Sequence, residues 1–186
     1  MAADTPSHPS VIIETPRLVL RAASDADIPV MYQRIFGDAE VMRHVFQGGV
    51  MGMERAEGFV RQHFTFGQTR TGIAILTEKA DGNVIGFAGL FPCNALEADD
   101  FEIGFVMARQ AWGRGYASEI GEAQLAMGFG EVGCRRLLGL VHPDNKASVH
   151  ALTKLGLRYH SHVTSPTRPP RSVYVISADA WRDRRA

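Results

Sequence analysis

The spacing of apolar residues changes in the middle of the chain, and this change limits the fold more than any other feature. Residues 72–77, 84–90 and 101–107 are short apolar or alternating segments, as expected for β-strands. Asp81-Gly82, a dipeptide typical of β-hairpins, stands between the first two. Apolar residues recur at helical spacing after a glycine-containing loop. The pattern therefore predicts three antiparallel strands followed by a helix, rather than a regular βαβ repeat.

One strand and two helices are expected before this meander. Residues 17–21 alternate and predict the strand, while helical spacing covers residues 24–36 and 54–68. Pro29 suits the first turn of a helix. Asp27 is therefore the expected N-cap of the first helix, ahead of the serine that opens the segment.

Two further helices and three further strands are expected after the meander. The first helix runs from Tyr116 to about Gly130, and either Asp144 or Asn145 caps the second, which ends at Gly156. The strands are expected over residues 137–141, 157–163 and 172–176. The whole order predicts an α+β fold with a mixed, mostly antiparallel sheet flanked by helices.

The composition is that of one globular domain. Of the 186 residues 45% are hydrophobic, and 20 Lys and Arg side chains balance 20 Asp and Glu. This neutrality argues against a nucleic-acid or membrane-surface binder, and no apolar run reaches the ~18 residues of a membrane-spanning helix. Residues 1–10 are expected to be a flexible leader rather than a secretory signal, 11–182 one domain and 183–186 a tail. Two cysteines give no disulfide framework, so we expect a cytoplasmic protein. The sequence leaves open whether it is a monomer or a homodimer.

The segment Gln110–Ala117 is the strongest candidate for a binding site. It joins a predicted strand to a predicted helix, and glycines at 113 and 115 let the backbone turn sharply and a ligand approach closely. The start of the helix and Arg114 both favour an anion, most naturally a pyrophosphate. A P-loop pattern is absent, and Ser118 stands where a dinucleotide-binding fingerprint needs glycine or alanine. The remaining alternative is a plain glycine-rich turn.

A second strand–helix junction, His142–Ser148, follows this loop, and together the two resemble the GNAT superfamily of acetyl-CoA-dependent N-acetyltransferases. The family's phosphate loop, Q/R-x-x-G-x-G/A, matches Gln110-x-x-Gly113-x-Gly115. The detailed pattern resembles the Rim-type branch, which includes ribosomal-protein N-terminal acetyltransferases. That resemblance extends roughly from Thr15 to Trp181 and rests on Thr15–Arg21, Glu102-Ile-Gly, Trp112–Glu119, Asn145, Ser148, Lys154 and Gly156.

The resemblance implies acetyl-CoA as cosubstrate, held where two strands of the sheet splay apart. Val106 and Met107 would lie along the pantetheine arm, Asn145 would contact the arm, and Ser148 would lie near the sulfur. No metal ion is implied, and the histidines at 142, 160 and 162 lack the partners of a metal site. The backbone that would hold the pyrophosphate belongs to Gln110, Gly113, Arg114, Gly115, Tyr116 and Ala117.

Glu102 and Ser148 are the candidate catalytic residues. Glu102 lies in a strand beside the expected arm, where it is a candidate general base, the alternative being a carboxylate bound by structural hydrogen bonds. Ser148 is a candidate donor to the departing thiolate, or simply the third residue of a helix capped by Asn145. Many members of the family carry a tyrosine in this helix, but here the nearby positions hold His150, Leu152 and Thr153, so no general acid is assigned.

The sequence thus predicts an N-acetyltransferase acting on a primary amine, which would be the α-amine of a protein N-terminus or of a small molecule. The alternative is a non-catalytic module that binds acyl-CoA. Neither nucleic acid nor a membrane is expected as a partner.

Overall fold

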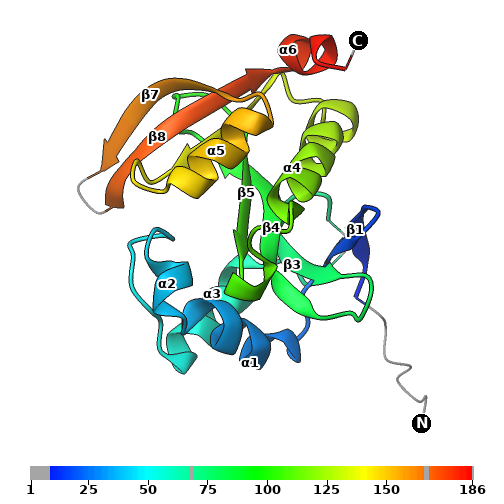
Figure 1. The fold of residues 1–186 in the computed structure, drawn as a ribbon, viewed down its shortest axis with the longest axis vertical. Coiled ribbons are helices and arrows are strands. Elements are labelled where there is room, and N and C mark those ends of the chain that lie inside the picture. Colours follow the sequence, from blue (N-terminus) through cyan, green and yellow to red (C-terminus); the bar gives the residue numbers. More distant parts are fainter. Residues whose placement is uncertain (1–8, 68, 166–167, 186) are drawn as a thin grey trace.

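The computed structural model describes residues 9–67, 69–165 and 168–185, and within them eight strands form one sheet (Figure 1). The strands are β1 (Val11–Glu14), β2 (Leu18–Arg21), β3 (Gly72–Glu78), β4 (Val84–Cys93), β5 (Asp100–Met107), β6 (Arg136–Val141), β7 (Arg158–Ser165) and β8 (Arg168–Ser177). Their order across the sheet is β1-β2-β3-β4-β5-β6-β8-β7. Every neighbouring pair is antiparallel except β5 and β6, which are parallel. The predicted mixed, mostly antiparallel sheet is confirmed.

Helices cover both faces of this sheet. They are α1 (Asp27–Met31), the π-helical η1 (Tyr32–Phe36), α2 (Ala39–Met42), α3 (Met53–His63), the 3-10 turn η2 (Arg109–Ala111), α4 (Tyr116–Met127), the π-helical η3 (Gly128–Val132), α5 (Lys146–Lys154) and α6 (Ala178–Asp183). On β5, Ile103 and Met107 belong to the core beneath α4 and α5, whereas Val106 packs against the core beneath α1, α2 and α3. Since alternate strand residues point to opposite faces, these are two cores on two sides of one sheet. None of the described helices has the length and apolar character needed to cross a membrane.

The seam between β5 and β6 is short. Only Phe101 with Leu137 and Glu102 with Leu138 are paired across it, whereas β5 pairs with β4, and β6 with β8, along their full lengths. Beyond Glu102 and Leu138 the two strands diverge. The predicted splayed strand pair is therefore confirmed.

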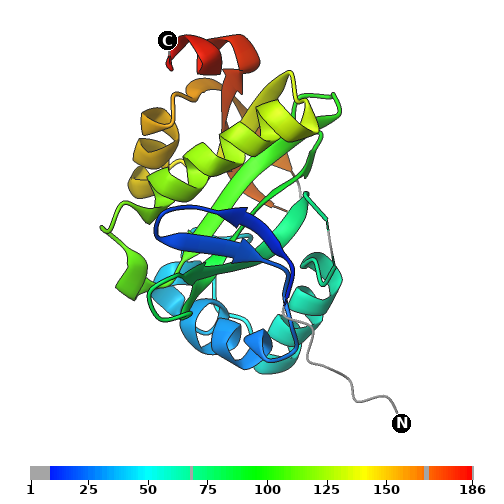
Figure 2. The same cartoon turned by 90° about the vertical axis from the view of Figure 1, so that its right-hand side faces the viewer.

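The glycine at position 121 brings α4 and α5 together over the splayed strands. A Cβ there would lie 2.4 Å from Cδ1 of Leu155, so any larger residue would have to displace the buried Leu155 side chain. Figures 1 and 2 show the two helices on the same side of the sheet.

The predicted helix boundaries need correction at two places. Asp27 is not the N-cap of α1 but lies inside it, because its carboxylate turns back to pair with Arg21 at 2.7 Å and to accept the Ser24 amide at 2.8 Å. Burial alone would raise the pKa of Asp27, but these hydrogen bonds outweigh it and hold the pKa below 3.8. The second predicted helix, α3, ends at His63, so Phe66 lies beyond it and is exposed.

Short elements at the edges of the fold are not predicted by the sequence patterns. They are β1, α2 and α6, each of four to six residues. The alternatives at the second junction are resolved, since Asn145 caps α5 and accepts the Ser148 amide at 3.1 Å. Of the predicted leader, residues 1–8 lie outside the described residues, while the Ser10 carbonyl accepts the Ala22 amide.

Candidate active site

The loop from Gln110 to Gly115 joins the end of β5 to the start of α4. Gly113 and Gly115 have φ angles of +71° and +79°, a left-handed conformation that side chains with a Cβ rarely adopt. Nothing lies within 4 Å of the place where a Cβ of Gly113 would stand. Gly115 is the N-cap of α4 and supplies no side chain to its first amides. The loop therefore presents open backbone N–H groups at a helix start, an arrangement that suits phosphate oxygens.

The N-terminal hairpin of β1 and β2 is far from this loop in the chain but holds it in place through direct hydrogen bonds (Figure 2). One carboxylate oxygen of Glu119, in the first turn of α4, accepts the Thr15 hydroxyl at 2.6 Å and the Arg17 amide at 2.9 Å. Its other oxygen accepts Nε of Arg17 at 2.6 Å. The same guanidinium donates to the Arg114 carbonyl at 3.0 Å, so Arg17 joins the hairpin to the loop and to the helix at once.

Two of the predicted cofactor residues, Arg114 and Tyr116, bind Glu78 of the protein with their side chains. Tyr116 is buried and its hydroxyl donates to Glu78, at the end of β3, while Arg114 pairs with the same carboxylate at 2.8 Å. The hydrogen bond to Glu78 raises the pKa of Tyr116 above its ordinary value. The guanidinium groups of Arg17 and Arg114 both lie over the Tyr116 ring, at 4.6 and 4.8 Å from its centre. The contributions of Arg114 and Tyr116 to an anion site would thus come first from their backbone.

Replacing Glu119 by glutamine is expected to lower the free energy of unfolding at pH 7 by about 1–3 kcal/mol, the scale of hydrogen bonds to a charged group. Burial raises the pKa of Glu119, but the bonds from Thr15 and Arg17 outweigh it and hold the pKa below 4.5. A carboxylate with a depressed pKa stabilises the fold above its unfolded pKa and loses that effect as the pH falls through the folded value.

The difference between wild type and Glu119→Gln should therefore be full at pH 7 and shrink below pH 4.5, as chemical denaturation at several pH values would measure. Glu122→Gln is the matched control: it lies on the same helix but removes a half-exposed ion pair with Arg184, so it should change little. An equal loss of unfolding free energy in the two variants would contradict the assignment of Glu119 as the residue that joins the hairpin to the loop.

The splayed part of β5 offers backbone groups to the space that β6 leaves. Ala108 donates its amide to Ile85 at 2.8 Å, and the β4–β5 register has no shift, so Val106 also exchanges backbone bonds with β4. The alternate residues Ile103 and Phe105 face β6 instead. The Glu102–Leu138 pairing uses the Ile103 amide, so the Ile103 carbonyl and both backbone groups of Phe105 point to the open side. Sequence reasoning misses these two residues, because which edge of a strand lies open depends on its register with both neighbours.

The carbonyl of Met107, at the end of the same edge, accepts the indole Nε1–H of Trp112 at 2.7 Å. Trp112 is 46% exposed, so this aromatic ring stands at the outer end of the splay, between β5 and the glycine loop. Of the two predicted residues, Met107 thus presents its amide on this open edge, whereas Val106 uses its backbone groups on β4.

Glu102 lies at the inner end of the splay, at the last position where β5 and β6 are paired. Its Oε1 accepts the amide of Leu140 at 3.3 Å across the opening, which is a long hydrogen bond. Phe91 is its cross-strand neighbour, and the Phe91 ring covers Gly104, where a Cβ would lie 2.8 Å from a ring carbon. The carboxylate therefore stands between an aromatic wall and the opening, while also holding β6.

The α5 junction is built as an N-cap. The side-chain oxygen of Asn145 accepts the Ser148 amide, so Ser148 does occupy the third position of a capped helix. Ser148 is half-buried, whereas Asn145 keeps its amide group free of the cap, which uses only the carbonyl oxygen.

Two histidines bring the segment after α2 to the other half of the sheet. The rings of His44 and His142 lie 4.9 Å apart, and burial, followed by the nearby His142, lowers the pKa of His44. Phe46 has a φ of +51° and its carbonyl accepts the Arg171 guanidinium from β8. Among the described residues, no group of three or more His, Cys, Asp or Glu side chains is arranged to hold a metal ion.

Comparisons with known proteins agree on one family. The family model described as "Acetyltransferase (GNAT) domain" matches residues 17–158. The chain is similar to the Bacillus subtilis N-acetyltransferase YoaA, at 30% identity over 79% of this chain and 82% of that one. It is also similar to B. subtilis YkkB, at 29% identity over 83% and 90% of the two chains.

The solved structures that resemble the chain share its fold. An acetyltransferase of the GNAT family from Bacillus anthracis superposes with a TM-score of 0.77 at 22% identity, covering 91% of this chain and 99% of that one. A spermidine N-acetyltransferase from Vibrio cholerae, solved with CoA and spermine, superposes with a TM-score of 0.69 at 16% identity, covering 88% and 97%.

Proposed function

The chain belongs to the GNAT family of acetyltransferases, and from this premise we propose that it transfers an acetyl group from acetyl-CoA to a primary amine. One observation supports this proposal above the others. The glycine loop with its two left-handed residues opens onto a splayed strand pair, and a carboxylate, Glu102, stands at the inner end of the splay. An anion site, a slot and a base thus follow one another along a single strand, β5.

The residues present suit the cosubstrate. The amides from Gly113 to Ala117, together with that of Gln110, would hold the pyrophosphate, because the loop is open at Gly113 and ends at a helix N-terminus. The edge of β5 at Ile103 and Phe105 would bind the amides of the pantetheine arm, with Val106 and Met107 beside it. Asn145 would contact the arm from the opposite side.

Acetyl-CoA supplies the acetyl group as a thioester. Its leaving group is a thiol with a pKa of about 8.5, which needs little help to depart. The amine attacks as a neutral molecule, and Glu102 would accept the proton that the ammonium form must lose. A bond forms between the amine nitrogen and the acetyl carbon while the bond to sulfur breaks, and the proton that this nitrogen then loses neutralises the departing thiolate. Ser148 would donate a hydrogen bond to the sulfur as it becomes a thiolate.

The acceptor that we propose is an α-amine. At pH 7 a lysine side chain with a pKa of about 10.4 is neutral roughly once in 2,500, whereas an α-amine with a pKa of about 7.8 is neutral roughly once in seven. The proposed site has one carboxylate as base, and α5 contains no tyrosine that could act as the general acid. It therefore has few groups that can move protons. Such a site favours the amine that loses its proton more easily, which agrees with the Rim-type resemblance.

A competition experiment tests the acceptor. A peptide with a free N-terminus and an internal lysine is incubated with acetyl-CoA, and fragmentation mass spectrometry locates the acetyl group. We expect at least about tenfold more acetylation at the α-amine, a fraction of the difference in neutral amine. Spermidine in parallel reactions provides a polyamine control. Predominant acetylation of lysine or spermidine would contradict the α-amine proposal, and absence of thiol release with every amine would instead favour a non-catalytic acyl-CoA-binding module.

A further inference from the structure

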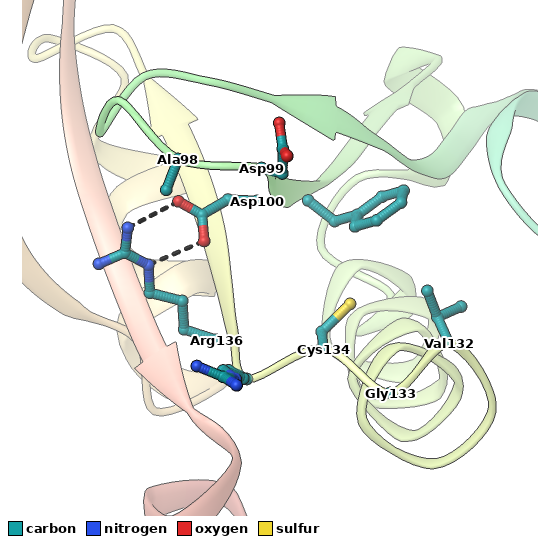
Figure 3. A pocket seen from close by; sticks show the side chains of 9 residues that line it. Ala98, Asp99, Asp100, Val132, Gly133, Cys134 and Arg136 are labelled. Atoms are coloured by element: carbon teal, nitrogen blue, oxygen red, sulfur yellow. Dashed lines mark hydrogen bonds and ion pairs between the residues drawn. The ribbon is translucent and has the colours of Figure 1, made fainter.

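We propose that the ion pair between Asp100 and Arg136 is a positioning element of acetyl transfer, which holds the closed end of the splayed strands and so sets the width of the opening. This inference rests on the proposed use of the splay by acetyl-CoA. It concerns residues at the other end of β5 from the glycine loop, beside an open pocket of about 550 Å³ (Figure 3).

The pair directly extends the short seam. Asp100 precedes Phe101 on β5 and Arg136 precedes Leu137 on β6, and these two following residues make the first of the two paired positions. Both bonds of the pair measure 2.8 Å, from Nε and Nη2 of Arg136 to the two carboxylate oxygens. A forked contact of this kind fixes orientation as well as distance. Figure 3 shows it spanning the two strands at the rim of the pocket.

Burial makes the pair effective. The side chain of Asp100 is 9% exposed and that of Arg136 is 34% exposed, so water competes little for the carboxylate. Two backbone pairings alone would leave the relative angle of β5 and β6 weakly determined. The pair adds a side-chain connection at the closed end of the seam, next to Phe101 and Leu137 and opposite the end where the strands diverge.

The same strand carries the reactive carboxylate two residues later. Asp100 and Glu102 share one face of β5, and both bind β6, the first through Arg136 and the second through the Leu140 amide. A change in the angle at Asp100 therefore moves Glu102 and the edge at Phe105 relative to β6. The glycine loop lies beyond the far end of β5, which is about 24 Å from Asp100 at ~3.4 Å a residue, and it should not sense the change directly.

The test compares two carboxylates with the same chemistry. Asp100→Asn removes the charge at the seam, whereas Asp27→Asn removes it from another buried forked pair, Arg21 and Asp27, which lies away from the splay. Both should lower the melting temperature. Well below it, we expect only Asp100→Asn to lower kcat and acetyl-CoA affinity by about tenfold, since small displacements of reacting groups have large effects on rate. Arg136→Lys, which keeps the charge and loses the fork, should fall between wild type and Asp100→Asn.

A truncated ligand separates positioning from general loss of structure. Adenosine 3′-phosphate 5′-diphosphate has the three phosphates of CoA but no pantetheine arm, so calorimetry should show wild-type affinity for it in Asp100→Asn. Wild-type kcat and acetyl-CoA affinity in Asp100→Asn, or equal losses for both ligands, would overturn the inference. Failure of the proposed function gives a different result. Wild-type protein that binds acetyl-CoA but acetylates no amine would refute the proposed catalysis. The affinities of Asp100→Asn for the two ligands would still test the role of the Asp100–Arg136 pair.

Discussion

Replacing Glu102 by glutamine is expected to lower kcat for amine acetylation by about 10²-fold or more while leaving acetyl-CoA affinity unchanged. Glutamine keeps the size of the side chain and can still accept the Leu140 amide, so the strand connection should survive. What is lost is the ability to take a proton from the ammonium form of the acceptor. The measurement is steady-state kinetics across pH, together with calorimetric titration of acetyl-CoA.

The pH profile makes this result specific. If Glu102 is the base, the acidic limb of the kcat profile should flatten in the variant, because no carboxylate remains to be protonated there. Glu54→Gln, an exposed position on α3, is the control and should behave as wild type. An unchanged profile and rate in Glu102→Gln would mean that solvent or another group acts as the base. Glu102 would then have only its structural hydrogen bond to β6.

Replacing Gly113 by valine is expected to weaken acetyl-CoA binding by about 30-fold or more, equivalent to ~2 kcal/mol of lost charge-assisted hydrogen bonds. The substitution acts in two ways. A β-branched residue resists a φ of +71°, so the loop amides turn away, and its side chain occupies the open space beside them. Calorimetry with coenzyme A measures the affinity, and thermal unfolding without ligand measures the fold.

A matched glycine controls for backbone strain. Gly82, in the turn between β3 and β4, has a φ of +70°, and nothing lies within 4 Å of the place where its Cβ would stand, as at Gly113. Gly82→Val should therefore lower stability by a similar amount but keep affinity for coenzyme A. Wild-type affinity in Gly113→Val would remove the phosphate-loop assignment, whatever its effect on stability.

The elements that can be predicted from the sequence are those whose patterns are long or strongly punctuated. The meander from Gly72 to Met107, the helix after Gly115 and the capped helix after Asn145 are each defined by periodicity together with a glycine or a cap. Elements of four to six residues, such as α2, are too short for a period to emerge. The prediction for Asp27 is wrong because an aspartate near a helix start can cap the helix or, as here, bind an arginine on the preceding strand.

Partners distant in the chain cannot be predicted from one sequence. The glycine loop is evident from its own residues, but Glu78, which binds both Arg114 and Tyr116, carries no local signal. Thr15 and Glu119 belong to separate parts of one resemblance, and only the fold shows that they bind each other. Likewise, Glu102 is recognisable as a carboxylate on a strand, while its contact with Leu140 depends on how β6 leaves the sheet.

The two-position seam between β5 and β6 also divides the sheet into two sets of strands, which we expect to open as separate units. The strands β1 to β5 are continuously bonded to one another, as are β6, β8 and β7, so the fewest backbone hydrogen bonds hold the sheet together at its centre. Local opening in proteins follows such boundaries. A molecule seated in the splay would touch both units and bind the closed arrangement alone, so its binding free energy would add to the free energy that joins them. Cosubstrate binding and folding would then be thermodynamically linked, with acetyl-CoA replacing the backbone hydrogen bonds that β5 and β6 do not make to each other.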